Sequence, residues 1–323
     1  MRPLRVGVVG AGGWGRNHLA VFRALPEVEL VGFCDHDAER RRSAEAEFGA
    51  RSCEDIAALS ALGVEAISIA VPTQAHHDVA MEAIERGLHL FIEKPIAASV
   101  EQADAIIARA REKSRLLQVG HLERWNGAFD AIRARSRRPH FVEVHRLAPF
   151  NPRGTDVAVV LDLMIHDIDL VLALVGRPVI SVDAVGVSVL SREIDIANAR
   201  LEFAGGAIAN LTASRISRDK VRKLRVFEEN MYLSADFVTC AVACFRRHAE
   251  PGAEPAYRIE QEPVEVTTEP PLTRELRAFA VAVRAGVEPL VTGADGRAAL
   301  DVACRILDAI ETRRRSLASA DSK

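Results

Sequence analysis

The amino-acid sequence predicts two domains of different class, an α/β domain at residues 1–121 and an α+β domain at residues 122–323. The first third alternates short apolar runs with amphipathic helical patterns, which is typical of a doubly wound parallel sheet. After Gly120 this rhythm stops, and residues 179–266 alternate apolar and polar side chains, which indicates a large, mostly antiparallel sheet. A chain of 323 residues is also long enough for two domains.

In the first domain, nine segments carry a clear strand or helix pattern. The fully apolar runs predict strands at residues 4–10, 29–35, 66–71, 89–93 and 116–120. Helical spacing predicts helices at residues 17–25, 38–48, 76–87 and 100–113. Because crossovers between parallel strands are right-handed, this order already restricts the topology to few possibilities.

The second domain is predicted to place helices on one face of its sheet. We expect a helix at 123–135, a strand at 141–147 and a long helix at 157–175, which ends at Gly176 with Pro178 beyond it. Gly205-Gly206 marks a hairpin within the sheet. Two closing helices, 272–285 and 297–315, could pack back toward the first domain.

Composition and charge exclude several classes of function. Hydrophobic residues make up 49% and charged residues 27%, which is ordinary globular composition, and the net charge is −3. We therefore expect neither a nucleic-acid partner nor a membrane partner. The N-terminal residues lack a signal-peptide layout, and five scattered cysteines suit reduced thiols, so a cytoplasmic location is expected.

A glycine-rich turn follows the first predicted strand and opens a helix. Its sequence is Gly10-Ala11-Gly12-Gly13-Trp14-Gly15, in the strand–turn–helix setting of a Rossmann dinucleotide site. Asp35 ends the second strand, where a carboxylate can accept the ribose hydroxyls of NAD and repel the extra phosphate of NADP. We predict NAD as the cofactor; Arg40 and Arg41 lie nearby and could tolerate NADP.

Three further segments bear a family resemblance. They are Val71-Pro72-Thr73-Gln74-Ala75-His76, Glu93-Lys94-Pro95 and Asp162-Leu163-Met164-Ile165-His166-Asp167. In order and spacing they resemble the glucose–fructose oxidoreductase / inositol dehydrogenase family over almost the whole chain. The resemblance implies an NAD-dependent oxidation of a sugar hydroxyl. It also implies an alkoxide-stabilising role for Lys94, a nicotinamide-ribose contact for Glu93, and cofactor-lining positions at Pro72, Thr73, His76 and Arg124.

Asp162 and His166 are the candidates for proton transfer. They stand four residues apart in a predicted helix and so share one face, where His166 can act as base and Asp162 can orient it. An ordinary surface pair is the alternative, and the presence of Lys94 at a strand's carboxyl end favours the catalytic interpretation. We expect no metal site, because Asp167 should point away from His166 and the helix has no second histidine at ligand spacing.

Several segments also resemble a narrower group, the bacterial UDP-N-acetylglucosamine 3-dehydrogenases. These segments are residues 146–150, 152–156, 162–169, 195–200 and 210–215. A nucleotide-sugar substrate needs cations for its diphosphate, and Arg146, Arg153 and Arg215 are the candidates. One departure is Gly127, where relatives often carry proline.

Two other functions stay open from the sequence. One is a dehydrogenase for inositol or a free sugar, and the other is a non-catalytic NAD-binding sensor. Retention of Lys94, Asp162 and His166 together argues against the sensor. The exposed face of the second domain's sheet is expected to join copies of the chain into a homodimer or homotetramer.

Overall fold

The computed structural model describes residues 2–151, 157–252 and 254–321. The chain divides into two compact units. Unit 1 comprises Met1–Trp125 and Glu269–Leu300, and unit 2 comprises Asn126–Thr268 and Asp301–Lys323. The closing part of the chain is therefore shared, with its first 32 residues (269 to 300) in unit 1 and the remainder in unit 2.

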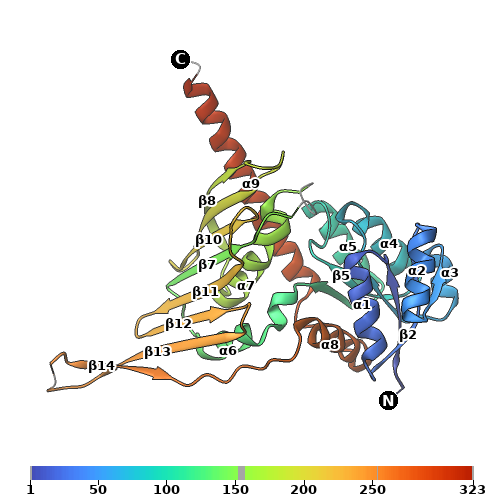
Figure 1. Ribbon diagram of the computed structural model, residues 1–323, viewed down its shortest axis with the longest axis horizontal. Helices are drawn as coiled ribbons and strands as arrows, with labels where there is room; N and C mark the ends of the chain where they lie inside the picture. Colours follow the sequence, from blue (N-terminus) through green and yellow to red (C-terminus); the bar gives the residue numbers. More distant parts are fainter. Residues whose placement is uncertain (1, 152–156, 253, 322–323) are drawn as a thin grey trace. The chain divides into compact units, whose positions relative to one another are not determined.

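Unit 1 is built on a six-stranded parallel sheet with the order β3-β2-β1-β4-β5-β6, which confirms the predicted doubly wound class. Helices flank this sheet in Figure 1. Its strands are β1 (Leu4–Val9), β2 (Val28–Cys34), β3 (Arg51–Cys53), β4 (Ala66–Ile69), β5 (His89–Glu93) and β6 (Leu117–Gly120). Its helices are α1 (Gly13–Ala24), α2 (Ala38–Phe48), α3 (Ile56–Ala61), α4 (His76–Glu85), α5 (Val100–Glu112) and α8 (Pro271–Ala285). Short 3₁₀ turns lie at Thr73–Ala75 and Leu122–Trp125.

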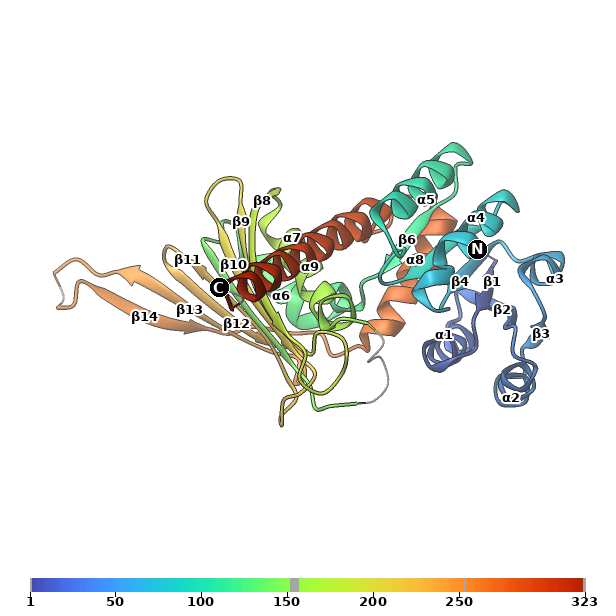
Figure 2. The same cartoon turned by 90° about the horizontal axis from the view of Figure 1, so that it is seen from above.

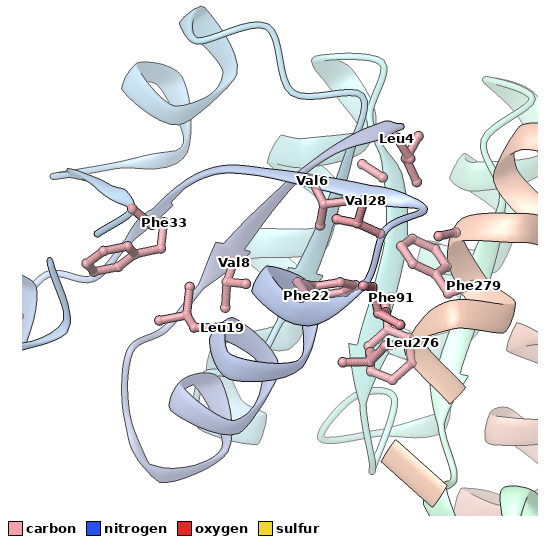
Figure 3. Packing of buried hydrophobic residues seen from close by; sticks show 14 of the residues in the cluster. Leu4, Val6, Val8, Leu19, Phe22, Val28, Phe33, Phe91, Leu276 and Phe279 are labelled. Carbon is pink, nitrogen blue, oxygen red and sulfur yellow. The ribbon is translucent and has the colours of Figure 1, made fainter. Parts of the chain in front are cut away.

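Helix α8 belongs to the core of unit 1 although it comes late in the chain. Leu276 and Phe279 of α8 are fully buried in the cluster that also contains Phe22 of α1 and Phe91 of β5 (Figure 3). The rings of Phe91 and Phe279 meet edge to face at 5.7 Å between centroids. Each such aromatic side chain buries a large apolar area, so α8 is held by the same hydrophobic contacts that seat α1.

Unit 2 contains an eight-stranded sheet with the order β14-β13-β12-β11-β7-β10-β9-β8. The strands are β7 (Phe141–Leu147), β8 (Val179–Val187), β9 (Ile196–Phe203), β10 (Ile208–Ser214), β11 (Val221–Glu228), β12 (Met231–Asp236), β13 (Ala241–Ala249) and β14 (Tyr257–Glu262). Among the strand pairs of the described residues in this sheet, β7 and β10 run parallel and the other pairs run antiparallel. This confirms the predicted, mostly antiparallel sheet.

Helices cover one face of this sheet, as predicted. Figure 2 shows α6 (Gly127–Arg135), α7 (Ile165–Val175) and the later part of α9 (Gly293–Asp321) on the same side of the strands. Along β9, Ala197, Ala199, Leu201 and Phe203 are buried, and the residues between them are exposed. This period of two separates a helix-covered face from an open face.

Two predicted helices are interrupted in the structure. The predicted helix 157–175 begins with a π-helical turn at Val160–Met164, and regular α-helix starts only at Ile165. The predicted helix 123–135 breaks at Asn126, whose side chain caps α6 by accepting a hydrogen bond from the Ala128 N–H at 3.0 Å. A Cβ at the next residue, Gly127, would lie 2.1 Å from the Thr267 carbonyl oxygen, which explains a glycine at this point.

Helix α7 is attached to the sheet by a buried ion pair. Arg146 of β7 donates to both carboxylate oxygens of Asp167 at 2.7–2.9 Å, and both side chains are about 3% exposed. A bidentate pair of this kind fixes orientation as well as distance. It therefore sets the rotation of the first turn of α7, next to His166.

We expect Arg146→Met to lower the free energy of unfolding by about 3–5 kcal/mol, because it leaves the buried Asp167 carboxylate without this partner. The matched control is Arg225→Met on β11. Arg225 pairs with Glu143 of β7 at 2.7 Å, but these side chains are 38% and 30% exposed, and a loss of at most about 1 kcal/mol is expected. Urea unfolding followed by circular dichroism measures the stability of both variants. Equal losses of unfolding free energy would contradict the special role of the buried Arg146–Asp167 pair.

Candidate active site

The glycine turn after β1 depends on backbone atoms that approach closely. Gly10 has a φ of +95°, and a Cβ there would lie 2.6 Å from the Ala70 carbonyl oxygen. A Cβ on Gly15 would lie 1.8 Å from the Gly10 carbonyl oxygen. Glycine is therefore required at both positions, and the N-terminus of α1 is held directly behind the turn.

A cavity of about 610 Å³ opens beside this turn. Several predicted cofactor residues line it: Gly10, Gly12, Gly13, Trp14, Asp35 and Pro72. A Cβ added to Gly12 or Gly13 would meet no atom within 4 Å, so this part of the backbone is open to a ligand. Unpaired N–H groups at a helix N-terminus favour phosphate, and the arrangement fits the pyrophosphate of a dinucleotide.

Asp35 lines the same cavity at the end of β2 and also holds the glycine turn in place. Its Oδ2 accepts the Ala11 N–H at 2.8 Å, and its Oδ1 accepts the Asp37 N–H at 2.9 Å. A carboxylate can accept further hydrogen bonds, so Asp35 can also bind ribose hydroxyls. His36 and Arg40 line the cavity as well. Arg40 is one of the two arginines predicted near this end of the site, and His36, which directly follows Asp35, is an additional lining residue.

Six residues predicted to bind the cofactor do not line this cavity: Gly15, Thr73, His76, Glu93, Lys94 and Arg124. His76 is 1% exposed, with Nδ1 2.8 Å from the Pro95 carbonyl oxygen and Nε2 3.0 Å from that of Val71. Burial lowers the pKa of His76. Arg124 is 7% exposed and lies 3.6 Å from Asp295, and Thr73 starts the 3₁₀ turn before α4. His76 thus joins the loop after β4 to the turn after β5.

Glu93 and Lys94 follow one another at the carboxyl end of β5. Glu93 is 9% exposed, and Lys94 is half-buried. The bond from Lys94 to Pro95 is cis. The carboxyl ends of strands are where ligands bind in open α/β sheets, so both side chains stand at the expected edge.

In unit 2, Asp162 lies in the π-helical turn and His166 in the first turn of α7. Both side chains are half-exposed, whereas the neighbouring Ile165, Asp167 and Ile168 are buried. π-Helical turns occur frequently at functional sites, because they re-aim side chains within a helix. The pair therefore stands on the accessible side of this segment, as the motif predicts.

Two of the predicted substrate arginines are engaged inside unit 2. Arg146 is committed to Asp167, as described above. Arg215 is 4% exposed, donates to the carbonyl oxygens of Val157 and Ile194, and lies 3.4 Å from Asp195. The guanidinium groups of both arginines therefore already have buried acceptors within unit 2. The third, Arg153, lies outside the described residues.

Metal ligands do not gather in the part of the chain that the structure describes: it holds no group of three or more His, Cys, Asp or Glu placed to bind an ion. Cys240 and Cys244 are separate, because Cys240 lies in the turn before β13 with a φ of +54° and Cys244 is buried in that strand.

Comparison with known families identifies both halves of the chain. The family described as "Oxidoreductase family, NAD-binding Rossmann fold" matches residues 4–121, and the "GFO/IDH/MocA C-terminal domain" matches residues 126–233. The chain belongs to the GFO/IDH/MocA family. It is therefore an oxidoreductase with an NAD-binding Rossmann domain, in a family of sugar dehydrogenases, and the predicted family and enzyme class are confirmed.

Individual members of the GFO/IDH/MocA family match over nearly the full length. UDP-N-acetylglucosamine 3-dehydrogenase of Acidithiobacillus ferrooxidans is 37% identical over 313 residues, which is 96% of this chain and 98% of that protein. A solved structure of that enzyme superposes with a TM-score of 0.90 over 97% of this chain and 99% of that chain. Myo-inositol 2-dehydrogenase of Thermotoga maritima is 23% identical, over 96% of this chain and 97% of that protein.

A more distant structure shares the fold alone. An oxidoreductase of Agrobacterium radiobacter has a TM-score of 0.82 at 17% identity, over 95% of this chain and 96% of that chain. None of the helices in the described part of the chain is both long enough and apolar enough to span a membrane.

The glycine turn provides a sharp test of the cofactor cavity. Gly15→Ala places a Cβ against a backbone oxygen that cannot move aside. We therefore expect the free energy of unfolding to fall by at least about 2 kcal/mol, and the affinity for NAD to fall as well. Gly13→Ala is the matched control for folding, because its Cβ meets no neighbour. Chemical denaturation and equilibrium NAD binding measure the two effects. Equal stability of the two variants would refute the close-approach argument.

Proposed function

We propose that this enzyme uses NAD to oxidise the 3-hydroxyl of UDP-N-acetylglucosamine to a 3-keto sugar. The observation that carries the proposal is the 37% identity to UDP-N-acetylglucosamine 3-dehydrogenase, which extends over 96% of the chain and so includes both units. The cavity beside the glycine turn supports NAD as the oxidant, because its lining suits a dinucleotide.

In the proposed reaction, His166 takes the hydroxyl proton of the substrate, and NAD held at the glycine turn and Asp35 would supply the acceptor for the hydride on the same carbon. Asp162, four residues earlier, orients the imidazole and stabilises its protonated form. The Lys94 ammonium stabilises the developing alkoxide. Bound NAD supplies the hydride acceptor, and the protein supplies orientation and electrostatics.

NAD is proposed over NADP because of Asp35. The carboxylate of this buried residue lines the cavity and would repel a ribose phosphate. Arg40 lines the same cavity, but its Nε lies 3.7 Å from Asp37, which offsets part of its charge. The balance of charge at this end of the cavity therefore favours the unphosphorylated ribose.

The open face of the unit 2 sheet supports assembly into a homo-oligomer. A row of aromatic side chains crosses four strands on this face, with centroid distances of 5.5, 5.0 and 6.0 Å between neighbours. The row is Phe141, Phe227, Tyr232 and Phe245. Half-exposed aromatic rings are typical of protein interfaces, so we propose that two copies associate through this face.

Turnover tests the substrate and the catalytic residues together. With NAD, UDP-N-acetylglucosamine and a carbonyl trap, the wild-type enzyme should form NADH, and Lys94→Ala and His166→Ala should each lower kcat by at least about a hundredfold. Lys113→Ala, at an exposed residue, and His248→Ala, at a half-buried residue of β13, should not. NADH formation with inositol or a free sugar alone would replace the substrate and keep the mechanism. NAD binding without turnover of any polyol would favour the sensor.

Assembly is tested by placing a charge in the aromatic row. Tyr232→Glu should shift the enzyme to a smaller species in sedimentation velocity, because association through this face would desolvate the new carboxylate. Arg42→Glu in α2, where the side chain is 72% exposed, should leave the sedimentation profile unchanged. An unaltered profile for Tyr232→Glu would place the interface elsewhere.

A further inference from the structure

A buried histidine stands between the glycine turn and the end of β5. His18, on α1, is fully buried, with Nδ1 2.6 Å from the hydroxyl of Ser68 on β4. Its Nε2 lies 3.0 Å from Oε1 of Glu93. We propose that His18 is a positioning residue, which fixes the Glu93 carboxylate for the hydroxyls of the nicotinamide ribose; this inference rests on the proposed use of NAD.

Strand order supports the assignment of Glu93 to the second ribose. Asp35 directly follows β2, the glycine turn follows β1, and Glu93 ends β5. With the order β2-β1-β4-β5, Asp35 and Glu93 are three strand spacings apart, about 14 Å. A dinucleotide has its two riboses on either side of a pyrophosphate. Asp35, the glycine turn and Glu93 follow the same sequence along this edge of the sheet.

The surroundings of His18 restrict it to one arrangement. Its ring contacts those of Trp14, Phe22 and Phe91 edge to face, at centroid distances of 6.4, 6.4 and 5.4 Å. These rings fix the plane of the imidazole, so that one ring nitrogen faces each polar partner. When Nε2 carries a proton toward the carboxylate, Nδ1 can accept a hydrogen bond from the Ser68 hydroxyl.

Glu93 is confined from a second direction as well. It pairs in register with Gly120 of β6, and a Cβ at Gly120 would lie 2.9 Å from the Glu93 Oε1. The carboxylate therefore sits between the imidazole of His18 and bare backbone. A carboxylate confined in this way loses little conformational entropy when a ligand binds, which strengthens ribose recognition.

Two conservative substitutions separate the two contacts of the imidazole. The amide of Gln reaches the position of Nε2, and that of Asn reaches only the position of Nδ1. His18→Gln therefore keeps a donor toward Glu93, whereas His18→Asn keeps the contact to Ser68 and loses the one to Glu93. We expect His18→Asn to weaken NAD binding about tenfold, and His18→Gln to stay within about threefold of the wild type.

Binding of ADP distinguishes positioning from general damage to unit 1. ADP retains the adenosine and pyrophosphate groups and lacks the nicotinamide ribose. His18→Asn should leave ADP affinity within about twofold of the wild type, because Asp35 and the glycine turn are unchanged. Fluorescence of Trp14, which lines the cavity and is 46% exposed, reports binding of either ligand without any sugar.

A double-mutant cycle completes the test. In a Glu93→Ala background, His18→Asn should change NAD affinity by less than about twofold, because the group that it positions is gone. Equal weakening of NAD and ADP binding, or equal effects of Gln and Asn, would overturn the proposal and leave His18 a packing residue. Because no sugar is present, these results do not depend on which sugar the enzyme oxidises. A failed turnover assay alongside the expected binding pattern would overturn only the proposed reaction.

Discussion

The contact of Gly15 with the carbonyl oxygen of Gly10 is the constraint on which unit 1 depends. Removing one Cβ lets α1 start directly against the end of β1, and this places the helix N-terminus at the cavity. This position of α1 also places His18 between Ser68 and Glu93 and places Phe22 in the same core cluster as Phe91. The close approach of Gly15 to Gly10 therefore determines the positions of the N-terminus of α1, of the His18 imidazole and of the aromatic core.

In unit 2 a different interaction has the comparable role. The pairing of Arg146 with Asp167 is buried, bidentate and directed across the junction of sheet and helix. A hydrophobic contact could bury similar area but would tolerate rotation of α7. The ion pair restricts that rotation, so Asp162 and His166 keep their half-exposed positions beside buried neighbours.

The sequence predicted what depends on local pattern. The fold class, most strands and helices, and the glycine turn with Asp35 follow from periodicity and a motif whose mechanism is local. The three-residue β3 and the six-residue α3 are too short for any periodicity to show. The π-helical turn has no signal in the spacing. The partners of Arg146, Arg215 and His76 could not be predicted, because a motif gives a residue's place in the chain, whereas the direction of its side chain depends on distant residues such as Asp167, Asp195 and Pro95. His18 did leave a signal, since Trp14, His18 and Phe22 recur at a spacing of four on α1.

The partnership of Arg146 and Asp167 also constrains how this chain can evolve. A change at either position alone removes this bidentate partner from a buried charge, and the two codons lie 21 positions apart, on different elements. Substitutions that persist at these two sites must therefore replace both residues, either by an apolar pair or by a pair with the charges reversed. Among descendants of this protein the two positions should consequently vary as a unit, and a lineage that has lost one member without the other should carry a compensating change in the packing around α7.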